Sequence, residues 1–275
     1  MRLLIRNWHL NQIWKSVLII LIATFLSEYL FTLIPISRLP FSHFWSAIFE
    51  RSLSSALTIL AIWYLYPQSL NRFRLKLTNS RVFIAIGLIL FVALPSLLQI
   101  QISHFSVLQI SGGFVFALFI GIDEEIFSRG LIFGALEKYG TWVAAIVSSI
   151  HFGILHLGNA AWGGQSWSYT LAQVLGASAA GFLFVGLMLF TGSIWIPIFF
   201  HGLIDTPMQF ETITNYTSQV TGAPNWGATL AQSVFFSAIG GLLIKLSNRD
   251  SYLIFIIRVK KYFLEPKSAT PVMDQ

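Results

Sequence analysis

Long apolar runs, separated by short polar segments, occupy most of this chain. Each run is close to the about 20 residues that an α-helix needs to cross the hydrocarbon core of a bilayer. Lipid cannot hydrogen-bond to backbone groups, so such runs must be helical. The sequence therefore predicts an all-α polytopic membrane protein with about eight transmembrane helices. The expected spans are residues 14–34, 44–66, 82–100, 112–136, 141–158, 168–190, 194–210 and 227–246.

The composition agrees with one membrane domain over residues 1–275. The chain is 55% hydrophobic and only 10% charged, whereas a soluble domain carries about 25% charged residues. No loop between the expected spans is long enough for a soluble domain of about 50 residues. The chain has no cysteine, which excludes disulfides and thiolate metal sites.

The distribution of basic residues predicts how the chain is oriented in a cell membrane. Cytoplasmic loops are rich in Lys and Arg, and eight spans with both termini in the cytoplasm leave only Arg38 and Arg51 in outer segments. The net charge of +6 therefore indicates orientation rather than binding to nucleic acid.

The basic N-terminus is read as the start of an uncleaved first span. Residues 247–275 are expected to form a basic cytoplasmic tail, either lying on the inner lipid surface or solvated. The basic residues on the inner side are Arg2, Arg6, Lys15, Arg72, Arg74, Lys76, Arg81, Lys138, Lys245, Arg249, Arg258, Lys260, Lys261 and Lys267.

The stretch "GIDEEIFSRG" places three acids and an arginine inside the fourth apolar run. Exposed to lipid, the four charges would cost on the order of 10 kcal/mol, so they must face protein or a water-filled cavity. Glu125 and Arg129 are four residues apart, in the favourable order of acid before base, and are expected to form an ion pair. Glu124 is rotated by about 100° from Glu125, so it lies outside that pair and can face another group. A carboxylate that is held near a second carboxylate in a low dielectric can serve as a proton shuttle. The alternative is that the acids end the helix and contact water, but the apolar "LIFGAL" follows Arg129.

The next two spans carry histidines at helical spacing. Phe152 and His156 in "HFGILH" share one helix face, whereas His151 points about 140° away from His156. His201 and Asp205 in "HGLID" also share a face, so the carboxylate could orient the imidazole or share a metal with it. The alternative interpretation is structural: a hydrogen-bonded packing histidine in the first span, and a His–Asp pair that only ties helices together in the second.

The three motifs, in this order, resemble those of one family. An acid pair with an arginine five residues after its first acid (Glu124, Glu125, Arg129), then F-x3-H (Phe152, His156), then H-x3-D (His201, Asp205), is similar to the CPBP intramembrane proteases. This family, the CAAX protease and bacteriocin-processing or Abi family, includes the type II CAAX prenyl endopeptidases. The CPBP-like catalytic core is expected over residues 110–245, and residues 1–105 contribute spans without motifs.

The resemblance implies hydrolysis of a peptide bond inside the membrane. It implies that Glu124 activates a water, that His156 helps to hold this water, and that His201 and Asp205 lie where the oxyanion forms. Glu125 and Arg129 would brace the helix. Because an ionised aspartate cannot donate a hydrogen bond, Asp205 must be protonated, orient His201 or bind a metal. A zinc ion held by Glu124, His156, His201 and Asp205 and a metal-free glutamate–histidine site are both compatible with these residues.

The sequence does not identify the substrate, and two other functions are compatible with the same residues. The resemblance and the short loops favour a bacterial enzyme that cuts a membrane-associated or secreted peptide or membrane protein, in bacteriocin maturation or self-immunity. One rival is a proton-coupled transporter, because intramembrane Glu, His and Asp also form proton relays; transporters usually show a repeat, which this sequence lacks. The other rival is a bacteriocin-immunity or interaction protein without catalysis.

Overall fold

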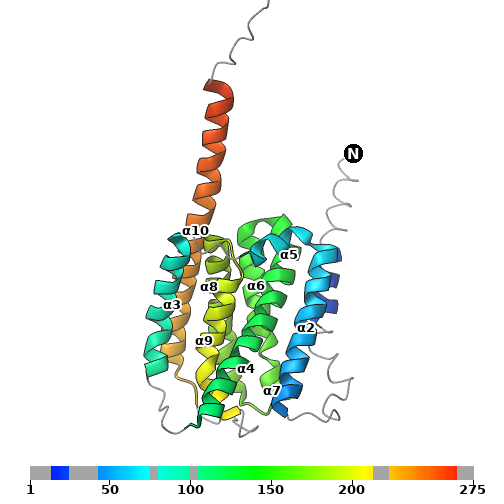
Figure 1. The fold of residues 1–275 in the computed structure, drawn as a ribbon, viewed down its shortest axis with the longest axis vertical. Coiled ribbons are helices and arrows are strands. Elements are labelled where there is room, and N and C mark those ends of the chain that lie inside the picture. Colours follow the sequence, from blue (N-terminus) through cyan, green and yellow to red (C-terminus); the bar gives the residue numbers. More distant parts are fainter. Residues whose placement is uncertain (1–13, 25–42, 75–79, 99–104, 213–222, 265–275) are drawn as a thin grey trace, which may run out of the picture.

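The structure is a computed structural model that describes residues 14–24, 43–74, 80–98, 105–212 and 223–264. Within these ranges the chain is helical and contains no strand, which confirms the all-α prediction. Figure 1 shows the long helices running roughly along one common direction, as in a membrane bundle.

The helices follow the expected spans closely. The first described helix covers Trp14–Thr24, and residues 25–34 of the first expected span lie outside the described residues. The remaining elements are α2 (His43–Leu65), η2 (Pro67–Phe73), α3 (Ser80–Leu98), α4 (Val107–Glu125), η4 (Ile126–Ile132), α5 (Phe133–Leu136), η5 (Glu137–Tyr139), α6 (Thr141–Leu155), α7 (Gly158–Ala161), α8 (Trp167–Thr191), α9 (Trp195–Thr212) and α10 (Trp226–Leu264).

Five helical segments in the described part are long and apolar enough to cross a membrane. They are Phe44–Leu65, Val107–Tyr139, Thr141–Ala161, Trp167–Thr191 and Trp226–Ser247. Shorter apolar helices cover Trp14–Thr24 and Ser80–Leu94. The chain is thus a multi-pass membrane protein by the length and composition of its helices, and the count of eight spans stays a prediction.

Helix α10 differs from the expected eighth span. It does not end near residue 246 but continues for 39 residues to Leu264, and Figure 1 shows its C-terminal part extending beyond the rest of the bundle. No glycine or proline follows Gly241 until Pro266, so nothing in the backbone stops the helix. The part of the tail that the structure describes is therefore a continuation of the last span rather than a separate segment.

Glycines bring the central helices into close contact. Helix α4 packs along α9, and α8 packs along α10 and α6. A Cβ atom added at Gly121 of α4 would lie 2.7 Å from the carbonyl oxygen of Ile198, and one added at Gly202 would lie 3.1 Å from that of Ala117. Small residues at such crossings let helix backbones approach each other. This contact holds the acids that follow Gly121 against His201, which precedes Gly202.

A second glycine contact, between α8 and α10, generates a stability prediction. A Cβ at Gly186 would lie 2.7 Å from the carbonyl oxygen of Gly240, whereas one at Gly176 on the same helix meets nothing within 4 Å. Gly186→Ala should lower the free energy of unfolding by about 1–3 kcal/mol through overpacking. Gly176→Ala is the matched control and should be neutral or stabilising, because alanine is the better helix former. Thermal unfolding in detergent measures both, and equal melting temperatures would contradict the packing of α8 on α10.

Candidate active site

The deepest feature of the site is the ion pair between Glu125 and Arg129. Arg129 Nη1 lies 2.9 Å from Glu125 Oε1, and both side chains are at most 1% exposed. The guanidinium group lies over the ring of Phe152, 4.4 Å from its centroid, and 5.2 Å from the centroid of Phe184. Arg129 belongs to the π-helical element η4, an irregularity that occurs often at functional sites. The expected pairing of these two residues is confirmed.

Glu125 has a second partner that the sequence did not predict. His201 Nδ1 lies 2.9 Å from Glu125 Oε1, so this carboxylate joins Arg129 of η4 to the imidazole of α9. The carboxylate is acceptor-only, so Nδ1 of His201 carries the proton. The ring also stacks on Phe184, with centroids 5.2 Å apart. Glu125 and Phe184 therefore fix the position of the His201 ring, and Glu125 also fixes its tautomer. The Nε2 atom lies on the side of the ring away from Glu125.

Two further carboxylates face Nε2 of His201. The nearest oxygen of Glu124 lies 3.7 Å from it and that of Asp205 lies 3.5 Å away. The two side chains keep about a quarter of their surface exposed, unlike Glu125. The group that orients His201 at Nδ1 is thus Glu125, while Asp205 lies on the Nε2 side together with Glu124. Helix α9 continues through Pro207, so this proline does not end it near the pair.

Arg51 of α2 completes the acidic side of the site. Its Nη1 atom donates to Asp123 Oδ2 at 3.1 Å and to Glu124 Oε1 at 3.3 Å. Ser55 Oγ also donates to Asp123, at 3.4 Å. From the sequence alone, Arg51 is only a charge in an outer segment. The available signal is its position near the start of an apolar run, where an arginine needs an anionic partner.

His156 lies at the end of α6, with its free nitrogen on the cavity side. Nδ1 lies 3.0 Å from the carbonyl oxygen of Phe152, and because a carbonyl only accepts, this nitrogen donates and Nε2 has a free lone pair. The Phe152 ring stands between the two histidines, 5.2 Å from His156 and 5.7 Å from His201. His151 instead pairs with Thr24 Oγ1 at 2.8 Å and does not line the cavity, as the helical spacing predicts.

These side chains line a cavity of about 1390 Å³ between α2, α4, α6, α8, α9 and α10. Glu124, His156, His201 and Asp205 all lie on its wall. Glu125 and Arg129 lie beneath the wall and hold His201 from behind. The structure thus brings the six predicted residues into two layers, four facing the cavity and two buried below them.

Whether the site can bind a metal ion depends on how its histidine nitrogens and carboxylate oxygens are arranged. In the described part of the chain, no group of three His, Asp or Glu side chains is placed to hold a metal ion. On the cavity wall, Nε2 of His201 lies 3.7 Å from Glu124 and 3.5 Å from Asp205, and Arg51 already engages Glu124. The arrangement suits a proton-transfer site better than a ligand set.

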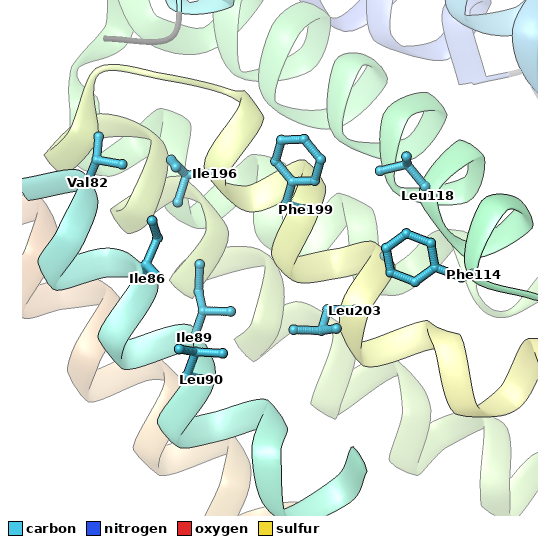
Figure 2. Close-up of a pocket in the computed structure, with 10 residues that line it drawn as sticks. Val82, Ile86, Ile89, Leu90, Phe114, Leu118, Ile196, Phe199 and Leu203 are labelled. Carbon is cyan, nitrogen blue, oxygen red and sulfur yellow. The ribbon is translucent and has the colours of Figure 1, made fainter. Parts of the chain in front are cut away.

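A second, smaller cavity lies on the other side of α9. It has a volume of about 340 Å³ and is lined by apolar side chains of α3, α4 and α9 and by Gly202. Figure 2 shows Phe199 and Leu203 of α9 facing Phe114 and Leu118 of α4 across this space. Its lining has no group that can exchange a proton, so this cavity contributes no polar side chain to the site.

Comparison with known proteins finds one family that the central part of the chain resembles. Residues 106–207 match the family model described as "Type II CAAX prenyl endopeptidase Rce1-like". Over this segment the chain is similar to the Rce1-like family. The finding confirms the resemblance to CPBP membrane proteases, and the Rce1-like segment contains all six predicted site residues. Arg51 lies outside it.

One curated relative matches over a similar length. "Putative membrane peptidase YdiL" of Bacillus subtilis (strain 168) is 39% identical over 102 residues, which are 36% of this chain and 37% of that protein. The matched part therefore spans little more than a third of the relative. No solved structure matches the chain.

The buried pair generates a prediction about stability. Arg129→Met leaves the Glu125 carboxylate buried without its cation, and breaking a buried pair from one side costs about 3–5 kcal/mol. The double variant Glu125→Gln/Arg129→Met should recover a large part of this loss, because the substituted amide is neutral and its oxygen can still accept from His201. Thermal unfolding of the purified variants in detergent checks the order. A double variant that is less stable than Arg129→Met would contradict the role given to the pair.

Proposed function

We propose that the chain is an intramembrane endopeptidase that hydrolyses a peptide bond with a water activated by Glu124. The observation that carries the proposal is that Glu124 and His201 lie on one cavity wall, with Glu125 and Arg129 buried behind them. Glu124 lies near the middle of the helical segment Val107–Tyr139. The similarity of residues 106–207 to the Rce1-like family and the relative that is named a peptidase support the same reaction class.

In the proposed reaction Glu124 acts as general base and then as general acid. It accepts a proton from a water, and the oxygen of that water forms a bond to the carbonyl carbon of the substrate. The carbon–nitrogen bond then breaks, and Glu124 returns the proton to the leaving amine. General acid–base catalysis of this kind contributes about 10²–10⁴-fold. Arg51 is a positioning residue, because its contact with Glu124 aims the carboxylate.

The two histidines complete the proposed site. Nε2 of His156 has a free lone pair toward the cavity and accepts the second hydrogen of the water. His201 is held through Nδ1 by Glu125 and donates from Nε2 to the developing oxyanion when the ring carries both protons. Asp205, 3.5 Å from Nε2, balances the charge of that ring. Preorganised donors aimed at developing charge are usually the largest single contribution to catalysis.

A zinc ion would have to be held by Glu124, His156, His201 and Asp205, and it would supply Lewis-acid activation of the water. The donor arrangement does not favour this set, so every step above uses the side chains of the chain itself. We expect purified protein to contain zinc well below one equivalent by elemental mass spectrometry. One equivalent of zinc in the wild type, lost in His201→Ala, would contradict the metal-free site.

The proposed substrate is a membrane-associated or secreted peptide, or a segment of a membrane protein. The curated relative is bacterial, which supports a bacterial role such as bacteriocin maturation or self-immunity. The bilayer is the second partner, because exposed Leu, Ile, Phe and Trp side chains cover the outside of the bundle.

Glu124→Gln tests the proposal with a control from the same cavity. Gln cannot accept the proton of the water, so we expect cleavage to fall by at least about a hundredfold. Glu50→Gln makes the same change at another carboxylate on the cavity wall and should leave cleavage unchanged. Peptide termini are mapped by mass spectrometry in membranes with wild type, either variant, or no protein, at equal abundance of the chain.

Termini that require Glu124 but not Glu50 would name the substrate and its cut site. Identical termini in membranes with wild type and with Glu124→Gln would overturn the protease proposal. If Glu124→Gln also still protected cells against a bacteriocin, a role in immunity without catalysis would replace it.

A further inference from the structure

We infer that the cavity opens on the extracytoplasmic face of the membrane, so that the substrate is a peptide segment that has already crossed the bilayer. That the cavity receives a substrate rests on the proposed function. The direction in which the cavity opens rests only on the structure and the charge distribution of the chain.

The cavity reaches the surface where several helices begin, at the exposed wall residues Trp162, Gly163, Asn225 and Ala228, and this end is called the mouth. Its wall includes residues from the early turns of α2, α8 and α10 and from α7 and the turn after it. Helix α7 lies at the bottom of the bundle in Figure 1, opposite the end from which α10 projects. The mouth residues are Glu50, Arg51, Gly158, Trp162, Gly163, Tyr169, Pro224, Asn225, Ala228 and Thr229.

Basic residues gather at the opposite end of the same helices. Arg72, after α2, pairs with Glu137 of η5. Arg81, at the start of α3, donates to the carbonyl oxygen of Phe190 near the end of α8. Lys138 lies in η5, which ends the helical segment Val107–Tyr139.

Two more lysines belong to this basic end. Lys245 lies two residues before Ser247, whose hydroxyl donates to the carbonyl oxygen of Leu189 near the end of α8. Helix α10 then continues through Arg249, Arg258, Lys260 and Lys261. Lys15 is beside Ser16, whose hydroxyl donates to the carbonyl oxygen of Ala135 in α5. In Figure 1, α5 lies at the top, at the end from which α10 projects.

The charge at the mouth is of a different kind. Among the described residues of the cavity wall, the one arginine is Arg51. It is engaged by Asp123 and Glu124, so it serves the site rather than the membrane surface. Lys and Arg accumulate on the cytoplasmic side of membrane proteins. The basic end is therefore cytoplasmic, and the cavity mouth faces the outside.

This direction restricts the substrate. A peptide reaches Glu124 by passing Tyr169, Asn225 and Thr229 from the outer surface, along a wall with small α8 residues such as Gly176 and Ala177. Secreted peptides and outward loops of membrane proteins fit this route. A cytoplasmic chain would have to pass the basic end, where Arg72 and Glu137 join η2 to η5.

The absence of cysteine from the chain gives a direct test. Ser168→Cys and Ser80→Cys make the same conservative change at exposed positions in the first turns of α8 and α3. These positions lie at the mouth and at the basic end, respectively. Intact protoplasts with the full-length chain are treated with a membrane-impermeant maleimide, before and after permeabilisation, and the mass shift of the chain is measured.

We expect Ser168→Cys to be labelled in intact protoplasts and Ser80→Cys only after permeabilisation. Labelling of Ser80→Cys in intact protoplasts, alone or together with Ser168→Cys, would overturn the inference. So would Ser168→Cys that reacts only after permeabilisation. If Ser168→Cys never reacts, Ala228→Cys, an exposed position on the mouth wall, decides by the same criterion. The labelling needs no enzymatic activity, so its result is separate from the fate of the protease proposal.

Discussion

The rest of the site depends on the two contacts that the buried carboxylate of Glu125 makes, with Arg129 and with His201. This carboxylate is fully buried and is shared between Arg129 and His201 at 2.9 Å each. A charge in such surroundings is tolerated only when it is paired and hydrogen-bonded. The pair therefore fixes how η4 and α9 lie against each other, and it leaves the imidazole of His201 with one defined orientation.

Packing in the second layer reinforces this arrangement. Phe152 and Phe184 cover the Arg129 cation, and a Cβ added at Gly181 would lie 2.9 Å from Arg129 Nη2. The aromatic faces stabilise the cation where water is excluded. Above this layer Glu124 lines the cavity and keeps about a quarter of its side chain exposed, so one carboxylate of the acid pair is buried and its neighbour is accessible. Adjacent positions on a helix point in different directions, which is how two consecutive glutamates come to have two environments.

Helical periodicity explains which features of the fold and the site can be predicted from the sequence. The apolar runs predict most helices to within a few residues, and spacings of four predict the Glu125–Arg129 contact and the shared faces of Phe152 with His156 and of His201 with Asp205. These are contacts within one helix, where the distance along the chain determines the geometry.

Contacts between helices carry no such signal. The hydrogen bond from His201 to Glu125 and the contacts of Arg51 with Asp123 and Glu124 join residues of separate helices, so no spacing predicts them. The continuation of α10 escapes prediction for a different reason: the apolar run ends near residue 246, although no residue there breaks the backbone. Polarity marks where a span leaves the apolar region, and it does not mark where its helix ends.

If Glu124 directs water to a peptide bond, the oxygen of that water must appear in the new carboxyl group, and incorporation of oxygen-18 measures this transfer. Membranes with the wild-type chain or with Glu124→Gln are incubated in water enriched in oxygen-18, and the newly formed C-terminal carboxyl groups are weighed by mass spectrometry. We expect new C-termini with one oxygen-18 atom in the wild type and none above background in Glu124→Gln. New C-termini without the label, or equal labelling in both membranes, would show that Glu124 does not activate the water.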